Sequence, residues 1–320
     1  MKTFMERFDD YWSGGPPVVR NLFLVRSVYP MLIFTSTYVL FVKIVGPYVM
    51  KNRKPVQMRP LIIVYNFWLV IFYVWYLLKG ISFIPRMGLQ MFCGSLLNND
   101  KYGEDIIKEL FFHVYYINII KYVEFIDTVF LVLSKKPATS LHVFHHAILP
   151  VFSWFGLRSE TGGYLGMFIG VNCLVHIIMY AYFGIAALGP KYQKYIWWKK
   201  YLTSLQILQF LVMTIYMSFM YAFGCCTSRF IFYLCIFLSV LFFFLFTNFY
   251  IGAFNDTEKK KKSQKNGFQQ TSKQNGINGC NGVPENDGSP LMYKNDGSPL
   301  TNTNGGSPLT YKNDLKKKDG

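Results

Sequence analysis

The feature that most limits how this chain can fold is a series of apolar stretches, each long enough to cross a lipid bilayer. A helix of about 20 residues spans a hydrocarbon layer of roughly 30 Å. Such stretches lie at 29–49, 61–78, 110–133, 139–157, 164–188, 201–223 and 230–253. The chain is 52% hydrophobic and 16% charged, whereas soluble domains carry about 25% charged residues. The sequence therefore predicts an all-α integral membrane protein with seven transmembrane helices.

The charged residues of the loops predict which way these helices point. Short cytosolic loops are enriched in Lys and Arg. Three loops on one predicted side lack acidic residues and hold Lys51, Arg53, Lys54, Arg59, Lys135, Lys136, Lys191, Lys194, Lys199 and Lys200. We expect this side to be cytosolic, so the C-terminus is cytosolic and the N-terminus lies on the opposite side. Because the basic residues lie between apolar stretches rather than on a soluble face, no nucleic-acid partner is predicted.

The pattern divides the chain into an N-terminal segment at 1–28, a helical domain at 29–253 and a polar tail at 254–320. The start of the chain has no cleavable apolar core, so no signal peptide is predicted. The tail is rich in Gly, Asn, Ser, Pro and Lys, contains a nine-residue repeat from Asn286, and is predicted to be disordered. Near its end, Lys317 and Lys318 match a cytosolic dilysine signal for retrieval to the endoplasmic reticulum. A solvated lysine run is the alternative.

Polar side chains interrupt four of the apolar stretches. Ionisable groups at membrane depth are costly, so they are candidates for function. In chain order the polar residues are Lys121, Glu124, Asp127 and Thr128, then His142, His145 and His146, then Asn172, His176 and Tyr180, then Thr203, Gln206 and Gln209. Each stretch places at least one of them roughly 8–12 Å from its cytosolic end. We expect one enclosed polar site in the cytosolic half of the membrane. For single residues, an internal ion pair or interhelical hydrogen bonds are the alternatives.

Three histidines within five residues favour chemistry over packing. Imidazole serves in general acid–base catalysis, nucleophilic catalysis or metal binding. The pattern is similar to the histidine boxes of membrane di-iron enzymes, which as a class need more histidines than the 5 present here. A single metal held by three histidines, and hence a metal-dependent lipid hydroxylase, stays open, as does a Cys173 thiol nucleophile. A seven-helix receptor or transporter fits the span count but gives no reason for the histidine cluster.

Four ordered motifs carry these polar residues. They are KxxExxDT at 121–128, HxxHH at 142–146, HxxMY at 176–180 and TxxQxxQ at 203–209. In this order they resemble the signatures of the ELO family, the elongases of very-long-chain fatty acids. The resemblance covers about residues 20–253 and looks closest to elongases that favour saturated and monounsaturated chains.

The resemblance implies a seven-helix enzyme of the endoplasmic reticulum. It would condense a fatty acyl-CoA with malonyl-CoA to give 3-ketoacyl-CoA, carbon dioxide and CoA. No cofactor and no metal are implied. The implied partners are the two CoA substrates, membrane lipid, and the reductases and dehydratase of the elongation cycle, while a homodimer stays open.

The resemblance also implies roles for individual residues. His145 would accept the acyl group with His176 beside it, and His142 and His146 would orient the site or handle protons. Lys121, a histidine or Gln206 would stabilise the enolate left by decarboxylation. Glu124 and Asp127 complete the predicted catalytic set. Substrate binding is expected from Asn172, Tyr180, Thr203, Gln206, Gln209, Lys199 and Lys200. The loop at 135–142 is shorter than the family's pattern and lacks its Gln, a departure that bears on CoA affinity.

The six cysteines show no CxxC or paired zinc spacing. The orientation places Cys93, Cys225 and Cys226 on the oxidising lumenal side, where a disulfide can persist. We therefore predict a bridge from Cys93 to Cys225 or Cys226, with three unpaired cysteines as the alternative. Cys173 and Cys235 fall within predicted helices, and Cys280 lies in the tail.

Overall fold

The computed structural model describes residues 17–94, 96, 102–159 and 163–275, and all regular secondary structure in these ranges is helical. The elements are α2 (Pro17–Arg20), α3 (Val28–Leu40), the π-helical turn η1 (Phe41–Val45), α4 (Gly46–Met50), α5 (Arg59–Ser82), α6 (Ile84–Met87), the 3-10 turn η2 (Leu89–Phe92), α7 (Glu104–Val123), α8 (Phe125–Leu133), α9 (Ser140–Arg158), α10 (Tyr164–Ala187), the 3-10 turn η3 (Pro190–Tyr195), α11 (Lys199–Ala222) and α12 (Arg229–Asn275). The predicted all-α class is confirmed for this part of the chain.

Five helical runs in the described residues are long and apolar enough to cross a membrane. They are Val28–Met50, Arg59–Met87, Tyr164–Ala187, Lys199–Ala222 and Arg229–Ala253. Each overlaps a predicted span, although the second runs to Met87 and not to the predicted end at 78, so the chain is a multi-pass membrane protein. The other two predicted spans correspond to α7 with α8 and to α9. α7 has charged residues in its first turn and Lys121 in its last, α8 is apolar but only 9 residues long, and α9 carries the three histidines.

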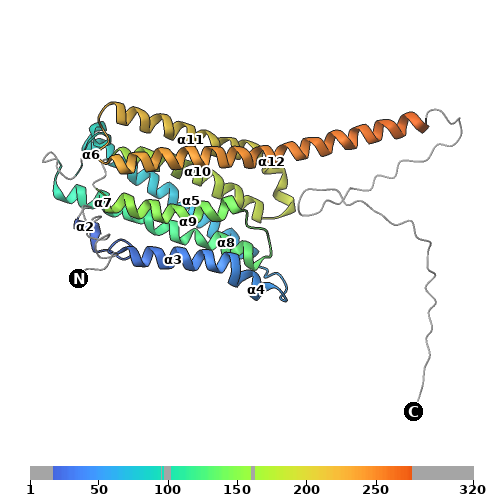
Figure 1. The fold of residues 1–320 in the computed structure, drawn as a ribbon, viewed down its shortest axis with the longest axis horizontal. Helices are drawn as coiled ribbons and strands as arrows, with labels where there is room; N and C mark the ends of the chain where they lie inside the picture. Colours follow the sequence, from blue (N-terminus) through green and yellow to red (C-terminus); the bar gives the residue numbers. More distant parts are fainter. Residues whose placement is uncertain (1–16, 95, 97–101, 160–162, 276–320) are drawn as a thin grey trace, which may run out of the picture. The chain divides into compact units, whose positions relative to one another are not determined.

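The helices lie side by side with their axes roughly aligned (Figure 1). α10 packs along α5, where Gly184 lies so close to Phe67 that a Cβ atom would come within 3.2 Å of the ring. α9 packs against both α3 and α7, and α11 packs against α10. The helices of the first two motifs, α7, α8 and α9, therefore pack on one another, while α10 with the third motif packs on α5 and α11.

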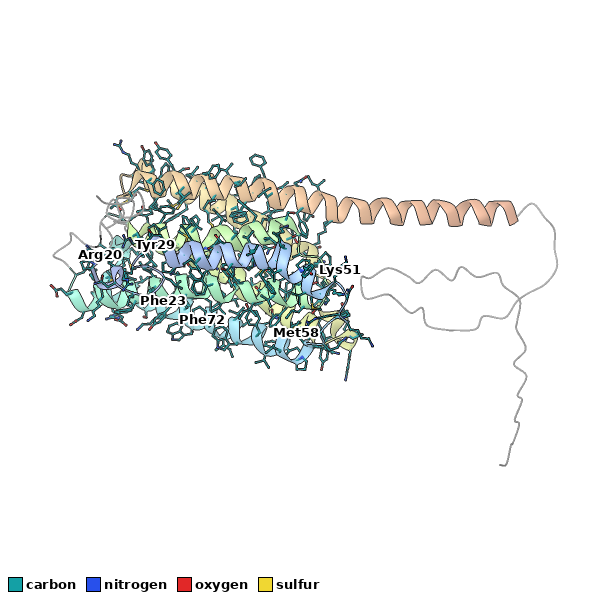
Figure 2. The ribbon with its side chains drawn as sticks, turned by 60° about the horizontal axis from the view of Figure 1, so that its bottom comes forward. Arg20, Phe23, Tyr29, Lys51, Met58 and Phe72 are labelled. Atoms are coloured by element: carbon teal, nitrogen blue, oxygen red, sulfur yellow. A yellow bond between two sulfur atoms is a disulfide. The ribbon has the colours of Figure 1, made fainter. Side chains whose placement is uncertain are left out.

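The two ends of the bundle differ in chemistry. Figure 2 shows Arg20 and Phe23 at one end and Lys51 and Met58 at the other. We call the second end, with loops 51–58, 134–139 and 188–198, the basic end, because these loops carry exposed Lys and Arg and no acidic residue. There the Arg59 guanidinium closes the end of α10, with Nε donating to the carbonyl of Ala187 at 2.7 Å.

The opposite end carries a disulfide, and we call it the disulfide end. Cys93 is bonded to Cys225, with Cα atoms 4.3 Å apart, and the N–H of Gly94 donates to the carbonyl of Cys225 at 3.1 Å. Of the two partners predicted for Cys93, the structure has Cys225, and Cys226 is a free thiol. Met91 and Leu96, on either side of Cys93, are buried. The bond therefore ties a packed segment to the turn between α11 and α12.

The last helix extends beyond its predicted boundary. α12 runs to Asn275, whereas the sequence placed the start of a disordered tail at residue 254. Lys, Glu and Gln in this stretch have high helix propensity, which accounts for the longer helix. A separate compact unit begins at Lys262. The repeats and the pair Lys317 and Lys318 lie outside the described residues, as does most of the predicted N-terminal segment.

Candidate active site

The centre of the site is a buried ion pair. Lys121 is 6% exposed and Glu124 is 1% exposed, and Nζ of Lys121 donates to the two carboxylate oxygens at 3.1 and 3.2 Å. An isolated charge is very costly inside an apolar bundle, so each group requires the other. Glu124 lies between the end of α7 and the start of α8. The sequence predicted one unbroken helix here, and periodicity cannot reveal an irregularity of a single residue.

Tyr73 from α5 joins this ion pair, and sequence reasoning missed it. Its hydroxyl donates to Oε1 of Glu124 and accepts a hydrogen bond from Nζ of Lys121 at 3.0 Å. Tyr73 belongs to none of the four motifs. A weak signal was available, since Tyr65, Tyr73 and Tyr76 fall on one face of the second apolar stretch. That spacing does not reveal which hydroxyl meets a charged partner.

His176 of α10 completes the polar cluster. Its Nδ1 lies 2.9 Å from the carbonyl oxygen of Asn172, and its Nε2 lies 3.4 Å from Nζ of Lys121. Because a carbonyl oxygen only accepts, we assign the ring proton to Nδ1. The lone pair of Nε2 then faces the Lys121 ammonium group. The predicted neighbours Lys121, Glu124 and His176 are therefore in direct contact.

His145 lies between this cluster and α12. Its ring centroid is 6.5 Å from that of His176 and 5.4 Å from that of His146. On the other side it meets Phe242 at 5.1 Å and Phe246 at 6.3 Å. One edge of His145 is thus near other imidazoles, while aromatic rings of the last helix cover another.

The other two histidines of α9 have different surroundings. Nε2 of His142 is hydrogen-bonded to Oγ1 of Thr128 at 2.9 Å, and Thr128 is hydrogen-bonded to the hydroxyl of Tyr38 at 2.9 Å. This chain links α9, α8 and α3, which suits an orienting role. His146 is 6% exposed, and its Nδ1 has no hydrogen-bond partner among the described residues.

Two further predicted residues meet near the cluster. The hydroxyl of Tyr180 donates to Oδ2 of Asp127 at 2.8 Å, which connects α10 to α8. The ring of Tyr180 stacks on that of Tyr73, with centroids 6.0 Å apart. Side chains therefore link the first and third motifs at two places, through Lys121 with His176 and through Asp127 with Tyr180.

The fourth motif makes mostly local contacts. Oγ1 of Thr203 donates to the carbonyl of Lys199 at 3.3 Å, and Nε2 of Gln206 donates to Sδ of Met179 at 3.4 Å. Gln209 is buried, with no hydrogen-bond partner for its Oε1 in the described part of the chain. Lys199 and Lys200 are exposed at the basic end. None of the contacts described for these five residues reaches the Lys121 cluster.

A cavity begins at the polar cluster and extends toward the disulfide end. Lys121, His145 and Asn172 line its polar end, and its walls are otherwise mostly aromatic and aliphatic side chains from α7, α9, α10, α11 and α12. Met91 and Leu96 line its far end, together with Gly163, where the Met91 carbonyl leaves no room for a Cβ atom. Along α7 the lining runs from Lys121 to Leu110, about three turns or roughly 16 Å.

Comparison with known proteins gives one consistent result. The family model described as "ELO: GNS1/SUR4 family" matches residues 23–263. Very long chain fatty acid elongase 7 of Rattus norvegicus is 37% identical over 270 residues, which cover 82% of this chain and 94% of the relative. The Drosophila melanogaster elongase 7 is 36% identical over 269 residues, 81% and 80% of the two chains. Very long chain fatty acid elongase 4 of Mus musculus is 33% identical over 289 residues, 87% and 90% of the two chains.

Proposed function

The chain belongs to the ELO family of fatty acid elongases, and on this premise we propose that it condenses a long-chain fatty acyl-CoA with malonyl-CoA. The products are 3-ketoacyl-CoA, carbon dioxide and CoA. This is the activity of a very-long-chain 3-oxoacyl-CoA synthase. The proposal requires no metal and no cofactor besides the two CoA substrates.

One observation carries the proposal: a long apolar cavity that has His145 and Lys121 at one end. An acyl chain needs an extended apolar enclosure, and its thioester needs a nucleophile and a charged donor where that enclosure ends. The tail of the acyl group would lie toward Met91 and Leu96. The thioester would lie beside His145, with the CoA moiety directed to the basic end.

The acyl transfer step follows from this placement. A nitrogen of His145 attacks the thioester carbonyl, the carbon–sulfur bond breaks, and CoA leaves as a thiol with the imidazole proton. His176 lies beside His145, and its unprotonated Nε2 faces Nζ of Lys121, which keeps the charge of Lys121 close to the reacting imidazole. His142 and Thr128 hold the start of α9 in place.

Condensation then releases the acyl group from the histidine. Malonyl-CoA loses carbon dioxide, and the resulting enolate attacks the acyl carbonyl to form the carbon–carbon bond of 3-ketoacyl-CoA. The imidazole of His145 is the leaving group, and it takes up one proton from water to return to its neutral form. Lys121 lines the same end of the cavity, so its positive charge can stabilise the enolate oxygen through space in a low-dielectric site.

The proposal includes a topology. We infer that two more segments cross the bilayer, α7 together with α8 as one span and α9 as another, which makes seven spans. The basic end then lies in the cytosol, and the disulfide end lies in the lumen of the endoplasmic reticulum. Excess Lys and Arg in the basic-end loops supports this orientation. Exposed Lys199 and Lys200 are then placed to meet CoA phosphates, and the short loop at 135–142 lies on the same side.

The direct test supplies membranes containing the chain with labelled malonyl-CoA and acyl-CoAs from C16 to C26. We expect labelled 3-ketoacyl-CoA from a subset of these chain lengths. Release of CoA from acyl-CoA before malonyl-CoA is added would support the acyl-histidine step. No labelled product at any length would refute the proposal. Activity that disappears under strong iron and zinc chelation would favour a metal-dependent lipid hydroxylase.

A further inference from the structure

We propose that Tyr73 is a positioning residue for Lys121, directing its ammonium group at Nε2 of His176. The inference rests on the condensation proposed above and adds a residue from outside the four motifs. An ammonium group has three N–H donors and no acceptor.

Three kinds of acceptor surround Nζ of Lys121. The Tyr73 hydroxyl oxygen is 3.0 Å away, the Glu124 carboxylate oxygens are 3.1 and 3.2 Å away, and Nε2 of His176 is 3.4 Å away. The Tyr73 hydrogen cannot point at Lys121, because that group accepts nothing, and it is donated to Glu124 instead. We assign one N–H of Lys121 to Tyr73 and one, shared as a bifurcated hydrogen bond, to the two oxygens of Glu124, so that the third points at Nε2 of His176.

Packing holds the Tyr73 hydroxyl in this place. Tyr73 is fully buried, and its ring lies 5.2 Å from the ring of His176 and 6.0 Å from that of Tyr180. The same core includes Leu69 and Tyr76 of α5. Because α5 packs closely along α10, the hydroxyl is fixed relative to His176 by the backbone of both helices.

Removing the Tyr73 hydroxyl is expected to slow the chemical step. Without the hydroxyl, Lys121 keeps only the Glu124 carboxylate as a strong acceptor and turns toward it, away from His176. Moving a catalytic charge by about 1 Å can lower the rate about 100-fold, because its effect on the transition state depends on its position. Tyr73 is not part of the cavity lining, so substrate binding should change little.

The experiment compares Tyr73→Phe with Tyr76→Phe in the purified full-length protein. Tyr76 is a matched control, since it is equally buried one turn away on α5 but stacks on His113 with centroids 3.8 Å apart. For Tyr73→Phe we expect kcat to fall about 10–100-fold, the effect of losing hydrogen bonds to charged groups. The KM values for both CoA substrates should stay within about 2-fold, because the loss is confined to the transition state. Tyr76→Phe should keep the wild-type kcat.

Rates are normalised to folded protein from size-exclusion chromatography, and acyl-CoA-dependent CoA release is followed separately. The role of Tyr73 is overturned if Tyr73→Phe keeps the wild-type kcat, if its loss appears in KM alone, or if Tyr76→Phe loses as much. If wild-type protein makes no 3-ketoacyl-CoA, the proposed function fails and this inference fails with it. A wild-type protein that is active beside an equally active Tyr73→Phe overturns the inference alone.

Discussion

At the scale of single residues, the site depends on two opposite charges buried among apolar helices. Removing one partner leaves the other charge without compensation, which costs about 3–5 kcal/mol in buried pairs. We expect Lys121→Met to destabilise the protein by this amount and to abolish condensation. The double variant Lys121→Met with Glu124→Gln should recover most of the stability and none of the activity. Thermal unfolding in detergent with a parallel condensation assay measures both. A double variant no more stable than the single variant would contradict the ion-pair account.

His145 permits a sharper separation of folding from chemistry. We expect His145→Ala to lose condensation and acyl-CoA-dependent CoA release while remaining folded in the membrane, because a nucleophile is lost from the edge of a cavity. His113→Phe is the matched control, since His113 is buried among aromatic rings and stacks on Tyr76. Condensation at the wild-type rate by well-expressed His145→Ala protein would remove His145 from the mechanism.

At the scale of helices, features set by neighbouring residues in the sequence could be predicted, and features set by packing between distant segments could not. All seven apolar stretches are helical in the structure, because hydrophobic runs and 3.6-residue spacing are local properties of the sequence. Spacing along each helix also predicted one depth for Asp127, His145, Tyr180 and Gln206, and a deeper one for Glu124 and His176. In the structure Asp127 meets Tyr180 and Glu124 lies beside His176, whereas the hydrogen bond of Gln206 goes to Met179. The place of Tyr73 in the site was not predicted, because it depends on how α5 is rotated about its axis relative to α7 and α10. That rotation is set by packing between distant segments, which one sequence does not display.

The disulfide gives a prediction for the elements at the far end of the cavity. The bond closes a loop with a sequence separation of 132 residues, for which the chain-entropy account allows up to about 5 kcal/mol. We expect Cys93→Ser to lower the thermal stability markedly. Because Met91 and Leu96 line the cavity beside the bond, we also expect product chain lengths to broaden upward. The control Cys226→Ser alters the neighbouring free thiol and should change neither property. An unchanged unfolding temperature in Cys93→Ser would show that the bond contributes little.

At the scale of the whole molecule, the proposed topology predicts where glycans attach. Asn255 begins an Asn-Asp-Thr sequon after the last apolar stretch, on the side proposed to be cytosolic, so it should remain unmodified. The substitution Asp100→Ser creates a sequon at Asn98 in the loop proposed to be lumenal, and we expect it to be glycosylated. Treatment with an endoglycosidase followed by gel electrophoresis reads both. A glycan on Asn255 would invert the topology.

The bond between Cys93 and Cys225 also has a consequence for the order in which this molecule is made. Chain synthesis adds Cys93 early and Cys225 only 132 positions later, after α3 to α11 have been synthesised. Until then no disulfide holds the segment that carries Met91 and Leu96 to the rest of the bundle. The far wall of the cavity is therefore among the last parts of the bundle to be completed. A nascent chain arrested before Cys225 would hold every predicted catalytic residue and still lack the bond that anchors the far wall of their cavity.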